Sequence, residues 1–171
     1  MSRIAFKKFA TKNLVHSFNS PELISTSLSF FNKDPSKLVL GASALNIVTR
    51  KSPSILYNKL SKKRNSRDES LGCQVFLNKT DSKVFFNYLN FVILPNLRDF
   101  NGFCFKKVFK SPTNSLIIKI EDLLVFPELN KDLDLFYGLG GVTVVFNFHT
   151  TKNIKSFLAL QNFPFNDSAR N

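Results

Sequence analysis

The chain has 171 residues, of which 43% are hydrophobic, and 20 of its 23 aromatic residues are Phe, so the composition excludes a disordered chain and suits one globular domain. Its formal net charge of +12 at pH 7 favours a polyanionic partner. Two cysteines, Cys73 and Cys104, are too few for a zinc site of paired ligands, and no apolar run approaches the roughly 20 residues that a membrane span needs.

The first predicted elements alternate between helix and strand. Residues 1–18 are basic, carry hydroxyl groups and lack acids, a composition typical of a mitochondrial transit peptide; the alternative is an opening helix. Alternation of apolar residues with Ser and Thr predicts a strand over 23–31. Asp34-Pro35 is typical of a helix start, and Ser52-Pro53 stops that helix. Its expected buried stripe comprises Leu38, Val39, Ala42, Leu45 and Val48.

Short strands are predicted over 55–57 and 71–77, on either side of a basic loop. Asp81 is expected to cap the next helix, and strands are expected over 103–109 and 115–120, joined by a turn at 111–114. In the helix that Asp81 is expected to cap, apolar residues spaced three and four positions apart predict one buried face. This face comprises Val84, Phe85, Tyr88, Phe91, Val92 and Leu94 or Pro95.

Gly138, Gly140 and Gly141 surround a tight loop that precedes a strand predicted over 142–149. A nucleotide-binding glycine motif lies between a strand and a helix, so these glycines favour a turn over a phosphate-binding loop. Thr150 or Thr151 is expected to cap the last helix. The order of elements predicts an α+β fold, an antiparallel-rich sheet with helices packed on one face and the other face free for RNA.

Positive charge is concentrated in the first part of the chain. Residues 1–67 contain 13 Lys and Arg but only two acids, Glu22 and Asp34, whereas residues 68–171 contain 11 and 10. The densest run, residues 59–67, has five cations in nine positions. A loop that only keeps a protein soluble can also be basic, but this segregation favours RNA. A membrane surface would require an apolar face opposite the cations, which the run lacks.

The residues that could form a nucleophile and base pair are few, and we predict no enzyme, cofactor or metal site. They are His16, His149, Cys73 and Cys104, and nothing around them resembles a nucleophile elbow. Asp132 and Asp134 lack the spacing of a metal-binding loop. Arg98-Asp99 is interpreted as a local ion pair that fixes a helix exit rather than as an RNA contact.

A series of segments in the second half carries a family resemblance. Residues 94–103, Leu-Pro-Asn-Leu-Arg-Asp-Phe-Asn-Gly-Phe, close an apolar helix with a proline and cross a polar turn. Phe126-Pro127-Glu128-Leu129, a β-branched strand ending at His149, and Asn162-Phe163-Pro164-Phe165 follow. The series resembles the bacterial-type large-subunit ribosomal protein L-five family, with the similarity extending from about residue 13 to residue 165.

The resemblance implies a structural constituent of the large ribosomal subunit, in the central protuberance, that binds 5S or adjacent large-subunit rRNA and approaches the peptidyl-site tRNA. Expected partners include neighbouring large-subunit proteins and a small-subunit protein across the intersubunit bridge, with no membrane. A skew toward Phe, Asn and Lys is typical of AT-rich genes and favours the mitochondrial branch, in the matrix and organelle-encoded. The alternative is a stand-alone RNA-binding assembly or maturation factor of the same fold.

We expect a single domain over 1–171, with a basic segment at 1–12 and a tail at 166–171. In the family a basic loop reaches toward tRNA, which implies a tRNA-proximal loop here. Its residues are Lys62, Lys63, Arg64 and Arg67. Other residues are expected to bind rRNA, mainly by neutralising phosphates. They are Lys7, Lys8, Lys12, Arg50, Lys51, Lys59, Asn78 and Lys79.

The chain departs from the family at three positions of the expected 5S rRNA contact. Where the family has Val-Thr-Leu-Arg-Gly, this chain has Val-Phe-Leu-Asn-Lys at residues 75–79. Where the family has Gly-Gln-Lys-Pro, it has Arg-Lys-Ser-Pro at residues 50–53, and where the family has Asn-Met-Gly, it has Ser-Phe-Phe at residues 29–31. Either the RNA partner has diverged or the contact has been rebuilt. Phe76, if exposed, is a candidate to stack on a base; the alternative is a core residue.

Overall fold

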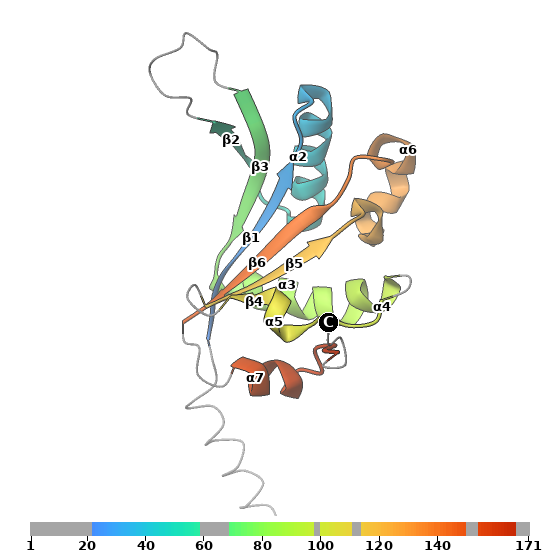
Figure 1. Ribbon diagram of the computed structural model, residues 1–171. Coiled ribbons are helices and arrows are strands. Elements are labelled where there is room, and N and C mark those ends of the chain that lie inside the picture. Colours follow the sequence, from blue (N-terminus) through green and yellow to red (C-terminus); the bar gives the residue numbers. More distant parts are fainter. Residues whose placement is uncertain (1–21, 59–68, 98–99, 111–113, 150–153, 167–171) are drawn as a thin grey trace, which may run out of the picture.

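The computed structural model describes residues 22–58, 69–97, 100–110, 114–149 and 154–166, and the predicted α+β fold is confirmed. Six antiparallel strands form one open sheet in the order β2-β3-β1-β6-β5-β4. The strands are β1 (Leu23–Phe31), β2 (Ser54–Asn58), β3 (Glu69–Leu77), β4 (Phe109–Lys110), β5 (Ser115–Ile120) and β6 (Val142–Phe148). The long central strand β1 pairs with both β3 and β6 (Figure 1).

The helices pack against one face of this sheet. They are α2 (Pro35–Thr49), α3 (Lys79–Tyr88), the π-helical turn η1 (Leu89–Ile93), α4 (Leu94–Asn96), α5 (Phe105–Val108), the 3₁₀ turns η3 (Leu123–Val125) and η4 (Pro127–Asp132), α6 (Leu133–Phe136) and α7 (Ile154–Leu160). In α3, Phe85 and Phe86 contact the ring of Phe146 of β6, and Phe157 of α7 contacts Phe148. The core is therefore a layer of Phe and aliphatic side chains between sheet and helices (Figure 1).

The stripe predicted for helix α2 is confirmed except at one residue: Leu38 and Leu45 are buried, and Ala42 and Val48 pack against the core. Val39 was expected to be buried but is 67% exposed, and Gly41 and Ala44 lie against the core instead. A Cβ atom at Gly41 would overlap ring atoms Cδ1 and Cε1 of Phe30. The close approach of helix and strand therefore selects small residues at this contact, which a hydrophobicity pattern does not identify.

The buried face predicted for the next helix was half right: Phe85 and Leu94 are buried and Tyr88 packs against the core, but Val84, Phe91 and Val92 are exposed. The residues that face the core are Ser82, Phe85, Phe86, Leu89, Asn90, Ile93 and Leu94. Two apolar stripes on this helix satisfy the same spacing, and packing against β6 selects one of them. Asp81 is not the cap either: α3 begins after Asn78, and Asp81 lies in its first turn.

The strand predicted over 103–109 was also wrong for most of its length. Only Phe109–Lys110 pairs with β5, and Phe103 forms a single parallel bridge with Phe165. The rings of Phe103 and Phe163 stack with centroids 5.6 Å apart, so aromatic packing against the C-terminal segment replaces strand pairing here. The short helices at 123–136 were not predicted.

Other predictions were confirmed. The strands β1, β2, β3, β5 and β6 lie where they were expected, and Gly138 and Gly140 have positive φ angles in the loop before β6. The predicted cap at Thr150 or Thr151 and the turn at 111–113 fall outside the described residues. The described chain continues to Asn166, whose backbone N–H donates to the carbonyl oxygen of Phe103 at 3.0 Å.

Candidate nucleic-acid interface

The face of the sheet opposite the helices is polar, and its residues follow from strand register. Successive side chains alternate between faces, so the neighbours of the core residues Leu28 and Phe30 point the other way. We call this the open face. On the four longer strands its residues include Ser25, Ser27, Ser29 and Phe31 of β1, Gly72, Gln74 and Phe76 of β3, Ser115, Ile117 and Lys119 of β5, and Thr143, Val145 and Asn147 of β6. Pairing also places Ser54 and Leu56 of β2 and Lys110 of β4 on this face, and Ser27, Ser29 and Ser115 are buried between larger neighbours. Among these positions there is no acidic residue.

Two large aromatic side chains stand exposed on the open face. Phe31 is 58% exposed and Phe76 is 65% exposed. Phe76 pairs with Ser27, and Phe31 pairs with Gly72, so four residues of strand separate the two rings, about 13 Å at the usual rise. Exposed aromatic rings on a polar surface are the groups on which unpaired bases stack. Of the two alternatives left open for Phe76, an exposed residue or a core residue, the structure has the exposed one.

A hydrogen-bonded line of polar side chains crosses three strands of the open face. The Ser115 hydroxyl of β5 donates to Oδ1 of Asn147 in β6 at 2.8 Å, and Nδ2 of Asn147 donates to the Ser25 hydroxyl of β1 at 3.2 Å. These bonds hold the amide of Asn147 in one orientation. The exposed Lys119, which pairs opposite Thr143, gives the open face a cationic donor suited to phosphate oxygens.

Four of the predicted rRNA-binding residues are described, and they lie where α2 ends and α3 begins. Asn78 precedes α3, and Lys79 is its first residue. Lys51 pairs with Asp81 at 3.1 Å, which brings the end of α2 beside the first turn of α3. Lys79 pairs with Glu22, and this bond and charge hold the pKa of the Glu22 carboxyl below its usual value. Both lysines thus have acidic partners.

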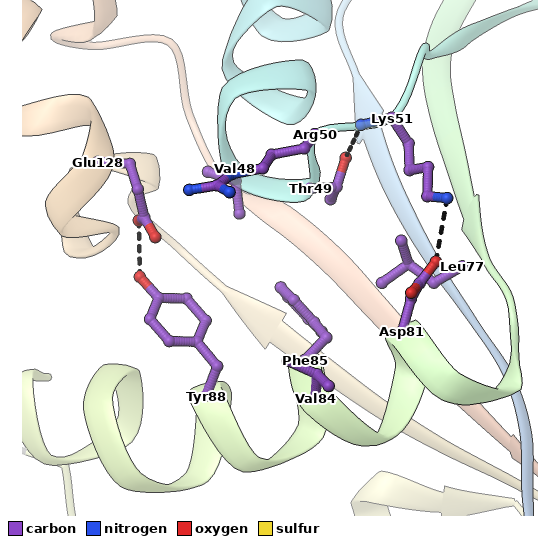
Figure 2. Close-up of a pocket in the computed structure, with 10 residues that line it drawn as sticks. All are labelled: Val48, Thr49, Arg50, Lys51, Leu77, Asp81, Val84, Phe85, Tyr88 and Glu128. Atoms are coloured by element: carbon purple, nitrogen blue, oxygen red, sulfur yellow. Dashed lines mark hydrogen bonds and ion pairs between the residues drawn. The ribbon is translucent and has the colours of Figure 1, made fainter.

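Arg50 takes a different position from its neighbour. It follows the last turn of α2 with φ 54°, and its backbone N–H donates to the carbonyl oxygen of Asn46 at 2.7 Å. Its side chain lines a pocket between α2, α3 and η4 (Figure 2). The predicted group of Arg50, Lys51, Asn78 and Lys79 is therefore brought together around one helix junction.

The other predicted binding residues lie outside the described part of the chain, so their positions stay predictions. They are Lys7, Lys8, Lys12 and Lys59 for rRNA, and Lys62, Lys63, Arg64 and Arg67 for the tRNA-proximal loop. The loop is nevertheless anchored by described strands, since β2 leads into it and β3 leads out of it as antiparallel neighbours. Arg98 and Asp99 also fall outside the description.

The two cysteines are free and differ in environment. Cys73 is buried in β3, and burial raises the pKa of its thiol to about 11, while Cys104 is partly exposed. Within the described ranges, no three His, Cys, Asp or Glu side chains gather into a set that could hold a metal ion. None of the described helices combines the length and hydrophobicity of a membrane span.

Sequence reasoning missed two features. The exposure of Phe31 and the line from Ser25 to Asn147 could have been inferred from the Ser residues at every second position of β1. The pocket beside Arg50 had no comparable signal, because it depends on how three elements that are distant in sequence pack together.

The fold is that of an α+β protein with an open antiparallel sheet, one layer of helices and a polar free face. The free face of such a sheet can bind a polymer chain. No family model matches the chain. It is 34% identical over 109 residues to the large ribosomal subunit protein uL5m of Reclinomonas americana, covering 64% of this chain and 55% of that protein. It is 32% identical over 96 residues to the large ribosomal subunit protein uL5 of Buchnera aphidicola subsp. Baizongia pistaciae (strain Bp), covering 56% of this chain and 52% of that protein.

These comparisons confirm the predicted resemblance to the uL5 proteins, the family of ribosomal protein L-five. The chain spans about half the length of the curated relatives that it matches.

Proposed function

We propose that the chain is a structural constituent of the large subunit of a mitochondrial ribosome and binds rRNA. Two uL5 relatives are named as large ribosomal subunit proteins, and one of them is a mitochondrial protein. The observation that carries the proposal is the open face, with exposed Phe31 and Phe76 on a polar surface whose described positions lack acids. No enzymatic step is part of this function.

RNA binding on this face would combine two physical effects. Phe31 and Phe76 would stack on unpaired bases, each contributing roughly 1–3 kcal/mol. The partly exposed Gln74, Thr143 and Asn147 and the exposed Lys119 would contact phosphate and sugar oxygens and so fix the position of the RNA. The cations of residues 1–67 would add counterion release, which makes binding depend steeply on salt.

The finer assignments rest on the family resemblance. The rRNA would be 5S rRNA or the large-subunit rRNA next to it, in the central protuberance. The loop with Lys62, Lys63, Arg64 and Arg67 would approach the peptidyl-site tRNA, and neighbouring large-subunit proteins and a small-subunit protein across the bridge would complete the surroundings. The mitochondrial matrix would be the location, with the gene in the organelle.

The test separates stacking from phosphate contacts by measuring RNA affinity at several salt concentrations. The probes are 5S rRNA and the large-subunit rRNA of the same ribosome. Phe31→Ala and Phe76→Ala should each weaken binding by roughly 5–150-fold with an unchanged salt slope. Replacing Lys62, Lys63 and Arg64 with Gln should weaken binding and reduce the slope by about 2 to 3.

The matched control is Phe91→Ala, since Phe91 is a comparably exposed phenylalanine on η1, in the helical layer. Equal losses in Phe76→Ala and Phe91→Ala would refute the open face as the RNA site. The alternative function, an assembly or maturation factor, predicts that the chain leaves mature large subunits in high salt. A ribosomal constituent sediments with them in a one-to-one ratio.

A further inference from the structure

A pocket of about 500 Å³ lies on the helical side of the molecule, between the end of α2, the first turns of α3 and η4 (Figure 2). Its lining is mixed in character. Val48, Leu77 and Phe85 supply apolar surface, and Val84 on α3 adds a side chain that is 70% exposed. A hollow with apolar walls and a few oriented polar groups is the usual form of a recognition site.

Arg50 supplies the charge that has no partner in this pocket. The left-handed conformation at a helix end is one that glycine adopts without cost, so an arginine at φ 54° is unusual. Figure 2 shows its guanidinium extending across the hollow toward Glu128 and Tyr88. Within the described part of the chain, Arg50 has no carboxylate within ion-pair distance.

The other polar groups of the pocket are already paired. Lys51 pairs with Asp81 at 3.1 Å, and the Tyr88 hydroxyl donates to Oε2 of Glu128 at 2.6 Å. Burial, and then the bond and charge of Glu128, raise the pKa of Tyr88, so the phenol stays a donor at neutral pH. Two carboxylates in the lining disfavour a phosphate group, and with two cations they leave the pocket nearly neutral.

An apolar stripe continues from the pocket along the outside of the helix. Val84, Tyr88 and Phe91 occupy successive turns, and Phe91 is 61% exposed. The core of the chain leaves Val84 and Phe91 of this stripe exposed, while Tyr88 between them is half-buried against the core. An unpaired cation at one end of an apolar stripe matches a polypeptide segment with a carboxylate beside bulky apolar side chains.

We propose that this pocket and stripe bind a segment of a neighbouring protein in which an Asp or Glu side chain stands next to a bulky apolar residue. The carboxylate pairs with the Arg50 guanidinium, and the apolar side chain packs on Val84 and Phe85. Residues 1–21 of the chain itself do not fit, because their charged side chains, Arg3, Lys7, Lys8 and Lys12, are all cations. The site lies on the helical layer, away from the open face, and it assigns Arg50 to a protein partner, in place of the rRNA contact that the sequence predicted for this residue.

The test uses the full chain and an array of overlapping 15-residue peptides that tile the other proteins of the same ribosome. Arg50→Gly removes the guanidinium and suits the backbone conformation at that position, so the melting temperature should not fall. Peptides that carry the acid and apolar pair should bind the natural chain, and Arg50→Gly should weaken them by about 10-fold or more. Val84→Gln should also weaken them, whereas the control Val39→Gln, at a similarly exposed position of α2, should not.

Four results would overturn the proposal. The first three are peptide binding to the natural chain that is no tighter than to Val84→Gln, binding that Arg50→Gly does not change, and displacement of the peptide by an RNA oligonucleotide. A peptide of residues 1–21 that competes with the best peptide would do the same. RNA affinity measured on the same preparations keeps the two proposals apart. A chain that binds the peptides but not RNA would contradict only the proposed function. A chain that binds RNA but not the peptides would contradict only the docking site.

Discussion

Phe30 and Phe31 are adjacent in β1 and have opposite surroundings. Phe30 is 1% exposed and packs under α2, where it meets Gly41, whereas Phe31 stands on the open face. The same contrast runs through the whole sheet. The core face carries Leu, Val, Ile and Phe side chains, while the open face carries mostly Ser, Thr, Gln and Asn with isolated aromatic rings.

The contrast shows how the two faces are specified. A shift of one residue in strand pairing would exchange them, so the core residues fix the register for both. Once the register is fixed, side chains on the open face can change without disturbing the fold. The departures from the family pattern at residues 29–31 and 75–79 fit this division, since they place Phe31 and Phe76 on the open face and leave Phe30, Val75 and Leu77 in the core.

The largest expected effect comes from truncating the buried member of the pair. Phe30→Ala should lower the free energy of unfolding by about 3–5 kcal/mol, because it removes a fully buried ring and leaves a cavity beneath α2. Phe31→Ala should change it by less than about 0.5 kcal/mol. Urea denaturation of both variants measures the difference. Similar losses in the two would mean that the open face is covered and packed.

A smaller effect is expected at the contact between α2 and Phe30. Gly41→Ala improves helix propensity by about 1 kcal/mol, but its methyl group would overlap the Phe30 ring. Phe30 is buried and cannot turn away, so we expect a net loss of about 1–2 kcal/mol.

The control for Gly41→Ala is Asn46→Ala, on an exposed turn of the same helix. It should leave stability unchanged or raise it slightly, since alanine is the better helix former. Thermal melts of both variants make the comparison. A Gly41→Ala variant that is as stable as Asn46→Ala would show that the helix does not press on Phe30.

The sequence was sufficient to predict the sheet because period-two patterns place strands well. Ser and apolar residues alternate through β1, and Gly138 to Gly141 mark the turn before β6, so both strands were located from local signals. The family resemblance then supplied the function to be tested. These predictions depended on short-range features, which the sequence shows directly.

The helix faces could not be predicted in the same way, because the choice depends on tertiary contacts. Val84 and Phe85 are adjacent and both apolar, and only packing against Phe146 decides that Phe85 is buried. Likewise, Arg50 and Lys51 look equivalent in sequence as two cations after a helix. The structure separates them, since Lys51 reaches Asp81 while Arg50 lines the pocket.

The last prediction about the two faces concerns Cys73, which lies on the core face of β3. Its neighbours in the strand, Gly72 and Gln74, lie on the open face. Burial raises the pKa of this thiol from 9.0 to about 11. A folded pKa above the unfolded one means that the stability linked to this group is fully present below about pH 9. It is lost as pH rises through about 11, up to about 2 kcal/mol in all.

Thiol labelling with a disulfide reagent at pH 8 makes this difference measurable. Because Cys104 is partly exposed and Cys73 is buried, Cys104 should be labelled quickly, and Cys73 should be labelled only as fast as the protein opens. Denaturation from pH 7 to pH 11 should show the stability loss in the natural chain and in Cys104→Ser, and a smaller loss in Cys73→Ala. Tyr88→Phe belongs in the same series, because the pKa of Tyr88 is raised as well and its ionisation acts in the same direction. If Cys73 and Cys104 are labelled at equal rates in the folded protein, the strand that separates the two faces is open to solvent on both sides.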